Sequence, residues 1–242
     1  MEKHLRLDKY LSDMNIGTRS EIKLWIRKGR VSINNLPCKR PEEKVSTDDE
    51  ITFDGQKIIY EQYLYYMLNK PVGVVSATED KKDRTVLDLI QTVKRKDLFP
   101  VGRLDKDTEG LLIITNDGNL AHRLLSPKKE VPKVYYARIK GRVTDADVAI
   151  FQSGVSIGED KPCLPAILKI LISDDISEIN LTIYEGKFHQ VKRMFEAVGK
   201  EVIYLKRIAM GGLSLDPTLK PGDYRRLTID ELNHLTNITI KK

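Results

Sequence analysis

Apolar residues in the first thirty positions recur with the period of helices. Four of them lie three or four residues apart, which predicts a helix with one buried stripe: Leu7, Tyr10, Leu11 and Met14. Thr18 and Glu21 have the spacing of a capping box. A second helix is therefore expected to begin there and to stop at Gly29.

The second predicted helix has one apolar face and one basic face. Ile22, Trp25 and Ile26 share the apolar side. The basic residues step by four along another side and continue past the helix end: Arg19, Lys23, Arg27, Lys28 and Arg30. A solvated helix face is the ordinary explanation of such a ridge. However, like charges at this spacing repel each other mildly, so the ridge also suits a bound anion.

Short strands are predicted after these helices. Residues 31–33, 51–53 and 57–59 have strand character, and the pairs Asn34-Asn35 and Asp54-Gly55 are typical of tight turns. Residues 1–59 are thus expected to form a small module of two helices and short strands. A linker near residues 60–62 follows it.

This module resembles the S4 RNA-binding domain. The resemblance rests on Arg6-Leu7-Asp8-Lys9-Tyr10-Leu11, Thr18-Arg19-Ser20-Glu21 and Lys28-Gly29-Arg30-Val31. It implies that residues 1–59 bind RNA and that the basic residues of the second helix and of the segment after it meet phosphates. S4 domains occur in ribosomal proteins, a synthetase and several RNA-modifying enzymes, so the domain alone does not choose an activity.

The remaining residues, 63–242, mix strand and helix patterns. Strand-like runs occupy residues 63–69, 111–115, 135–139, 179–184 and 202–205. Helix-like runs occupy residues 118–125, 144–154 and 190–198. The two kinds do not alternate strictly, so we expect an α+β fold with a mixed, mostly antiparallel sheet rather than a doubly wound parallel sheet.

The charge of the chain favours an anionic partner. Lys and Arg number 41 against 35 Asp and Glu, which gives a net charge of +6 and a pI near 9.1. No apolar run approaches the roughly 20 residues needed to span a bilayer, and no signal-peptide core follows Met1. A cytoplasmic protein without membrane attachment is therefore expected, and nothing in the sequence suggests more than a monomer.

The cysteines and histidines do not indicate a metal or a disulfide. Cys38 and Cys163 are far apart and are expected to be free thiols. The four histidines are scattered without a second ligand at metal spacing. Chemistry without a metal or a cofactor is therefore expected.

One carboxylate, that of Asp105, lies in a basic, turn-forming segment, Gly102-Arg103-Leu104-Asp105, just ahead of the apolar run 111–115. An aspartate in a polar turn is ordinarily a hydrogen-bonding turn residue, and from these residues alone that explanation stays open. Neighbouring motifs make it a candidate catalytic group.

These motifs resemble those of pseudouridine synthases, in particular the ribosomal RNA family that carries an S4 domain in front. The resemblance spans nearly the whole chain and keeps one order of motifs: Asn69-Lys70-Pro71-Val72-Gly73, Gly102 to Asp105, Asn116-Asp117-Gly118, Ser126-Pro127, Lys133-Val134-Tyr135, Glu185 to Gln190, and Gly211-Gly212-Leu213. The segment Lys187-Phe188-His189-Gln190-Val191-Lys192 resembles the small-subunit branch, which modifies 16S rRNA.

The resemblance implies three catalytic residues. Asp105 is expected to attack the uridine or assist glycosidic cleavage, after which the freed uracil turns and reattaches through C5. Lys192 matches the basic partner of that aspartate, although many relatives have Arg there. Tyr135 matches the tyrosine that stacks on the target base, and strand alternation would send the neighbouring Tyr136 to the opposite face.

Further basic residues are expected to contact RNA. Arg103 could fill the space vacated by a flipped base or hold a phosphate, and Arg193 is the alternative to Lys192 as the basic partner. Five lysines are expected along the approach to the site: Lys70, Lys106, Lys128, Lys129 and Lys133.

Several alternatives remain open at this point. The chain could be a non-catalytic RNA-binding or ribosome-assembly factor, although such a factor would not need Asp105, Tyr135 and Lys192 together. It could act on 23S rRNA rather than on 16S rRNA or a small-subunit assembly intermediate. A glycosidic hydrolase would be expected to use a second carboxylate, for which Asp107 is the near candidate.

Overall fold

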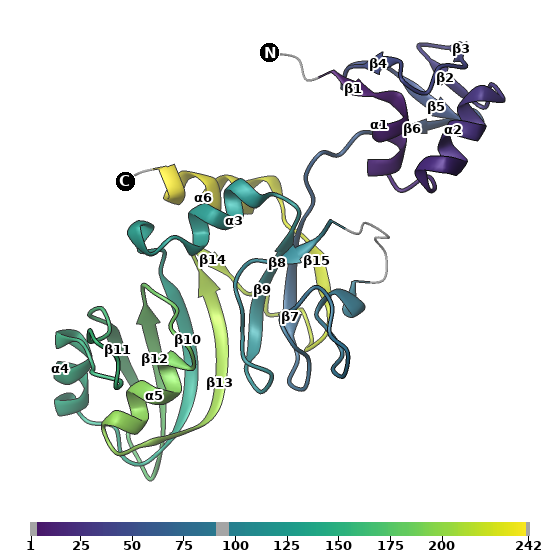
Figure 1. Ribbon diagram of the computed structural model, residues 1–242. Helices are drawn as coiled ribbons and strands as arrows, with labels where there is room; N and C mark the ends of the chain where they lie inside the picture. Colours follow the sequence, from purple (N-terminus) through teal and green to yellow (C-terminus); the bar gives the residue numbers. More distant parts are fainter. Residues whose placement is uncertain (1–3, 91–96, 241–242) are drawn as a thin grey trace. The chain divides into compact units, whose positions relative to one another are not determined.

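The computed structural model describes residues 4–90 and 97–240 (Figure 1). Spatial contacts divide the chain into two compact units. Of the described residues, 4–63 and 97 belong to the small unit, and 64–90 with 98–240 form the large unit. Among the residues described, no helix combines the length and apolar character needed to cross a bilayer.

The small unit contains two helices beside short antiparallel strands. Helices α1 (Leu7–Asp13) and α2 (Arg19–Arg27) pack around a core that includes Leu7, Tyr10 and Ile22. Four strands pair in the order β3-β2-β5-β6: β2 (Val31–Ile33), β3 (Leu36–Cys38), β5 (Ile51–Phe53) and β6 (Gln56–Ile58). A separate pair joins β1 (Leu5–Arg6) to β4 (Lys44–Val45).

The predicted start of the second helix is confirmed. The Thr18 hydroxyl accepts a hydrogen bond from the Glu21 amide at 3.3 Å, and the Glu21 carboxylate accepts one from the Thr18 amide at 2.8 Å. These reciprocal bonds satisfy amides that have no partner within the helix. After the helix, Gly29 adopts a left-handed conformation with φ +75°, which suits glycine and ends the helix.

One mixed sheet organises the large unit. Its main path runs β11-β12-β10-β13-β9-β7-β15, and only the β13–β9 pair is parallel among the pairs described. The strands on this path are β7 (Tyr65–Lys70), β9 (Glu109–Thr115), β10 (Lys133–Lys140), β11 (Ile167–Ile172), β12 (Ile176–Ile183), β13 (Glu201–Met210) and β15 (Tyr224–Arg226). Strand β8 (Phe99–Pro100) pairs with β9, and β14 (Leu213–Ser214) pairs with β13. The predicted α+β fold with a mixed, mostly antiparallel sheet is confirmed.

Helices cover the sheet in two groups (Figure 1). Helices α3 (Gly118–Leu125) and α6 (Ile229–Ile240) contact each other, and their buried residues Leu120, Leu124 and Leu235 share a core with Leu111 of β9. Helix α4 (Asp145–Ser153) packs on β11, and α5 (Gln190–Ala197) packs on β13. Short 3-10 turns, η1 (Leu87–Leu89) and η2 (Pro127–Lys129), lie in the connections.

Candidate active site

Asp105 lies in a loop whose backbone is anchored on both sides. The Ser76 hydroxyl accepts a hydrogen bond from the Leu104 amide at 3.0 Å and donates one to the Leu104 carbonyl at 2.8 Å. On the other side, the Thr108 amide donates to the Asp105 carbonyl at 3.1 Å and closes a turn. The loop joins β8 to β9, so the sheet fixes both of its ends.

A fully buried lysine, Lys70, forms hydrogen bonds to the backbone of this loop. The Lys70 ammonium donates to the carbonyls of Thr108 at 2.9 Å, of Asp105 at 3.0 Å and of Pro71 at 3.0 Å. Burial lowers the pKa of Lys70 to about 8. The expectation that Lys70 lines an RNA approach is wrong, since its side chain is inaccessible and its donors bind backbone oxygens.

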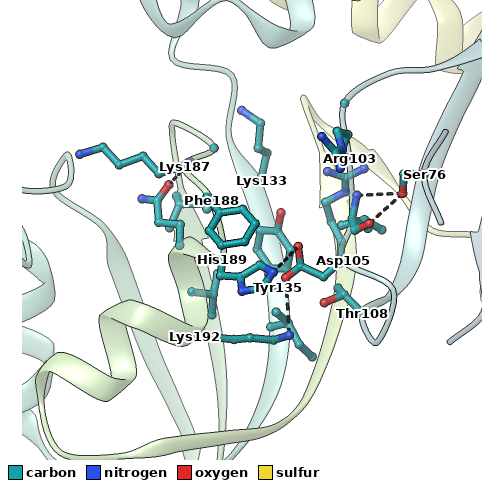
Figure 2. Close-up of a pocket in the computed structure, with 18 of the residues that line it drawn as sticks. Ser76, Arg103, Asp105, Thr108, Lys133, Tyr135, Lys187, Phe188, His189 and Lys192 are labelled. Carbon is teal, nitrogen blue, oxygen red and sulfur yellow. Dashed lines mark hydrogen bonds and ion pairs between the residues drawn. The ribbon is translucent and has the colours of Figure 1, made fainter. Parts of the chain in front are cut away.

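Asp105 faces a pocket of about 780 Å³. The pocket is lined by the Asp105 loop, by residues of β10 and β13, and by the segment from Glu185 to Lys192 (Figure 2). The Asp105 side chain is 29% exposed, so it is accessible from the pocket yet partly withdrawn from bulk water.

Two side-chain nitrogens approach the Asp105 carboxylate. Lys192 Nζ lies 3.5 Å from Asp105 Oδ2, and His189 Nε2 lies 3.6 Å from Asp105 Oδ1. The same Lys192 ammonium donates to Asp107 Oδ1 at 2.6 Å and to Asp107 Oδ2 at 2.8 Å. Lys192 therefore spans two carboxylates and lies closer to Asp107, whose pKa it lowers through this hydrogen bond.

Tyr135 projects from β10 on the face that forms one wall of the pocket. Its side chain is 8% exposed, and its register partner across the ladder to β13 is Arg207, so both side chains share a face of the sheet. Tyr136 lies on the other face, where its ring contacts Tyr204 at 6.0 Å between centroids. The prediction that alternation separates the two tyrosines is confirmed, and the structure brings Asp105, Tyr135 and Lys192 to one pocket.

Two buried cations lie in the same wall: Lys133, which was expected along the approach to the site, and Arg207, which was not named from the sequence. Lys133 donates to the Val131 carbonyl at 3.0 Å, and burial together with the nearby Arg207 charge lowers the pKa of Lys133 to about 8. Arg207 donates through Nε to the Leu111 carbonyl at 2.8 Å, and its buried Nη2 has no partner among the described residues. Strand alternation puts Lys133 on the same face of β10 as Tyr135, two residues further along.

His189 was also missed as a contact of Asp105. It precedes α5 in a left-handed conformation with φ +48°, which is uncommon for a residue with a side chain. Its ring stacks on that of Phe188, with centroids 3.8 Å apart and planes 18° from parallel. The only signal in the sequence was its place in the Lys187 to Lys192 segment.

The predicted RNA-contacting residues of the large unit lie in different surroundings. Arg103 is exposed and lines the pocket. The Arg193 guanidinium instead donates to Glu159 Oε1 at 2.7 Å and to the Phe188 carbonyl at 3.1 Å. Arg193 is therefore held outside the lining of the pocket, where it braces the turn before α5.

The basic residues of the small unit lie on or after α2. Arg19, Arg27 and Lys28 are exposed, and Lys23 is half-buried. Arg30 forms a fork with the Asp54 carboxylate and lies over the rings of Trp25 and Phe53, at 5.3 and 4.7 Å from their centroids. Contact of these residues with RNA stays a prediction.

The thiols and acidic groups of the described residues do not form a metal site. Cys38 and Cys163 are free, as expected. Within residues 4–90 and 97–240, no cluster of three His, Cys, Asp or Glu side chains has the arrangement of a metal site.

Comparison with known proteins places the large unit in a family. Residues 64–197 match the family described as RNA pseudouridylate synthase, and residues 5–51 match the S4 domain. The chain belongs to the RNA pseudouridylate synthase family. A solved structure described as a pseudouridylate synthase covers 96% of this chain and 99% of its own, with 39% identity and a TM-score of 0.68.

Curated relatives of this synthase match nearly end to end. The RNA pseudouridine synthase YtzG of Bacillus subtilis, itself described as uncharacterised, is 49% identical and covers 96% of this chain and 98% of its own. The ribosomal small subunit pseudouridine synthase A of Vibrio cholerae is 39% identical, covering 94% and 98%. The ribosomal large subunit pseudouridine synthase B of Bacillus subtilis is also 39% identical, covering 95% of each chain.

Proposed function

We propose that this pseudouridine synthase isomerises a uridine of ribosomal RNA and that Asp105 is its catalytic carboxylate. The observation that carries the proposal is the position of Asp105: a partly exposed carboxylate on an anchored loop, facing a pocket beside Lys192 and His189. The Lys192 ammonium lies 3.5 Å from Asp105 Oδ2, where it attracts the negative charge of a carboxylate nucleophile.

The reaction requires no group beyond those of the substrate and the protein. The bond between N1 and the sugar breaks, a bond between C5 and the sugar forms, and the hydrogen of C5 is replaced by one on N1. Asp105 attacks the uridine or assists the cleavage, while the pocket retains the freed uracil as it turns. Because the product is an isomer, neither a cofactor nor a redox partner is required.

Tyr135 supports this reaction by stacking on the target base. A uridine in structured RNA must leave its stack at a cost of a few kcal/mol, and an aromatic platform returns about 1 to 3 kcal/mol per base. Tyr135 is nearly buried at the wall of the pocket and lies in the same lining as Asp105. Arg103 at the exposed edge is suited to occupy the vacated space or to hold a phosphate.

We further propose 16S rRNA, free or within a small-subunit assembly intermediate, as the substrate. The support is the Lys187 to Lys192 segment, which resembles the small-subunit branch, together with the relatives named for that subunit. A 23S substrate is the alternative, because a relative named for the large subunit is equally similar. Maps of rRNA modification in cells with and without this protein discriminate the two.

The catalytic assignment is tested with matched substitutions in one loop. Asp105→Asn is expected to abolish pseudouridine formation while folding and RNA affinity stay close to the wild type, because one charge is removed without a change of size. Asp107→Asn removes the other carboxylate near Lys192 and is expected to retain product. Carbodiimide labelling with primer extension on rRNA transcripts measures the product.

Three results would count against this assignment. Pseudouridine formed by the Asp105→Asn variant would remove Asp105 from the chemistry. Loss of product in Asp107→Asn with activity retained in Asp105→Asn would move the catalytic role to Asp107. RNA binding without product in the wild-type chain, on rRNA from cells that lack it, would favour a non-catalytic RNA-binding factor.

A further inference from the structure

The ring of Phe188 is exposed at the edge of the active-site pocket. It is 74% exposed, whereas the other four phenylalanines of the chain are buried or half-buried. It also belongs to the lining of the pocket that contains Asp105 (Figure 2). A scattered apolar residue on a surface needs no explanation, but a flat ring at the edge of a nucleic-acid site is a candidate contact.

The turn that carries Phe188 is held rigidly. Arg193 donates to the Phe188 carbonyl at 3.1 Å, and the Lys187 amide donates to Gln190 Oε1 at 2.9 Å. Gln190 in turn donates to Glu185 Oε1 at 3.0 Å. These bonds fix the backbone on both sides of Phe188, so a ligand that contacts the ring orders little of the chain.

One face of the Phe188 ring is already covered. The His189 ring stacks on this face, with centroids 3.8 Å apart and nearly parallel planes, so the two rings form a stacked pair. The high exposure of Phe188 leaves the other side of the ring accessible. A nucleobase is a flat π system that stacks on such a ring whatever its sequence.

We propose that Phe188 is the stacking platform for the base of a nucleotide directly adjacent to the target uridine. This inference rests on the proposed function. The target base is expected at Tyr135, which is nearly buried, whereas Phe188 lies at the exposed edge where the neighbouring nucleotide passes. Six lysines and arginines but three carboxylates line this pocket, a balance that suits a phosphodiester chain crossing it.

The first test compares substitutions of the ring. Phe188→Leu keeps an apolar side chain but removes the flat surface, Phe188→Tyr keeps the ring, and Ile229→Ala alters a comparably exposed residue outside the pocket lining. With short RNA fragments around the uridine that the wild type converts, Phe188→Leu is expected to raise Kd about 5- to 150-fold, the equivalent of one stacked base. The conversion rate at saturating RNA should stay within about two-fold. Phe188→Tyr and Ile229→Ala should bind as the wild type does.

A second test identifies the base through a double-mutant cycle. An abasic ribose replaces the nucleotide on the 5′ or the 3′ side of the target uridine, and Kd is measured for the wild type and for Phe188→Leu. At one of the two positions, the abasic substitution should weaken the wild type and have little further effect on the variant. The inference is overturned if the effects of Phe188→Leu and of the abasic ribose on Kd are fully additive at both positions. It is also overturned if Phe188→Leu leaves Kd unchanged, with or without a fall in the conversion rate at saturating RNA. Failure of the wild type to convert any rRNA uridine would instead contradict the proposed function.

Discussion

Lys70 and Lys133 carry positive charges into the interior of the large unit, and the fold uses them differently. The Lys70 ammonium donates hydrogen bonds to backbone carbonyls of the Asp105 loop and of Pro71, and these bonds hold the loop in place. Lys133 makes one such bond and faces Arg207, a second cation, beside the pocket. Burial therefore lowers the pKa of both lysines to about 8.

Lys70 makes the stability of the protein depend on pH in a defined direction. Its pKa is about 8 in the folded chain, against 10.5 as the reference value for the unfolded chain. Between these two pH values the unfolded chain binds more protons at Lys70 than the folded chain does. The contribution of Lys70 to the free energy of unfolding therefore rises with pH by up to about 3 kcal/mol, and it does not change with pH below the folded pKa. Urea unfolding at pH 7.5 and pH 10 should show a smaller rise in Lys70→Met than in the wild type. Equal rises would contradict this role.

The residues of the site were predictable to the extent that their motifs were continuous in the sequence. Asp105, Tyr135 and Lys192 were named from such motifs, and the structure brings them into one pocket. Arg207 was not named, because its relation to the pocket depends on the parallel pairing of two strands distant in the chain. The contact of Lys192 with Asp107 could not be predicted from the sequence either, because Asp105 and Asp107 are two residues apart and both lie within reach of the Lys192 ammonium.

The elements were predicted best where one face is buried and the other is solvated. Helix α3 was predicted with its observed bounds, and α5 with an end that differs by one residue. Strand β11 was missed because apolar residues lie on both of its faces, with Ile167 and Leu171 exposed, so no alternation was visible. Helix α6 was also missed, because its polar and β-branched residues give only a weak helical signal.

The parallel pairing of β9 with β13 depends on Gly110. This glycine has φ +104°, and a Cβ built there would lie 2.2 Å from the Arg207 carbonyl oxygen. Gly110→Ala is therefore expected to cost about 3 kcal/mol or more in free energy of unfolding. Gly118→Ala is the matched control, because a Cβ there meets no atom within 4 Å, and it should stay within about 1 kcal/mol of the wild type. Urea denaturation measures the free energy of unfolding of both variants. A change of less than about 1 kcal/mol in Gly110→Ala would show that β9 and β13 can move apart at this position without loss of stability.

At the scale of the whole molecule, substrate capture and chemistry are assigned to different parts of the chain. The pocket with Asp105 is formed wholly by residues of the large unit. The small unit matches the S4 domain and presents exposed Arg19, Arg27 and Lys28. Each phosphate that such a residue neutralises adds about 0.7 to 0.9 to the slope of log affinity against log salt. The S4 unit should therefore contribute affinity and salt dependence rather than rate.

Removal of residues 1–59 tests this division of labour. The truncated chain is expected to show a higher KM on rRNA and a shallower salt dependence, with kcat at saturating RNA largely retained, because Asp105, Tyr135 and Lys192 all remain. Replacement of Arg19, Lys23 and Arg27 by Gln in the full-length chain is the matched variant, since it removes charge from exposed or half-buried positions and leaves the apolar face of α2 intact. It should change KM in the same direction by a smaller factor. A fall in kcat with unchanged apparent affinity, in a truncated chain whose circular dichroism shows a folded large unit, would mean that residues 1–59 act on the chemical step instead.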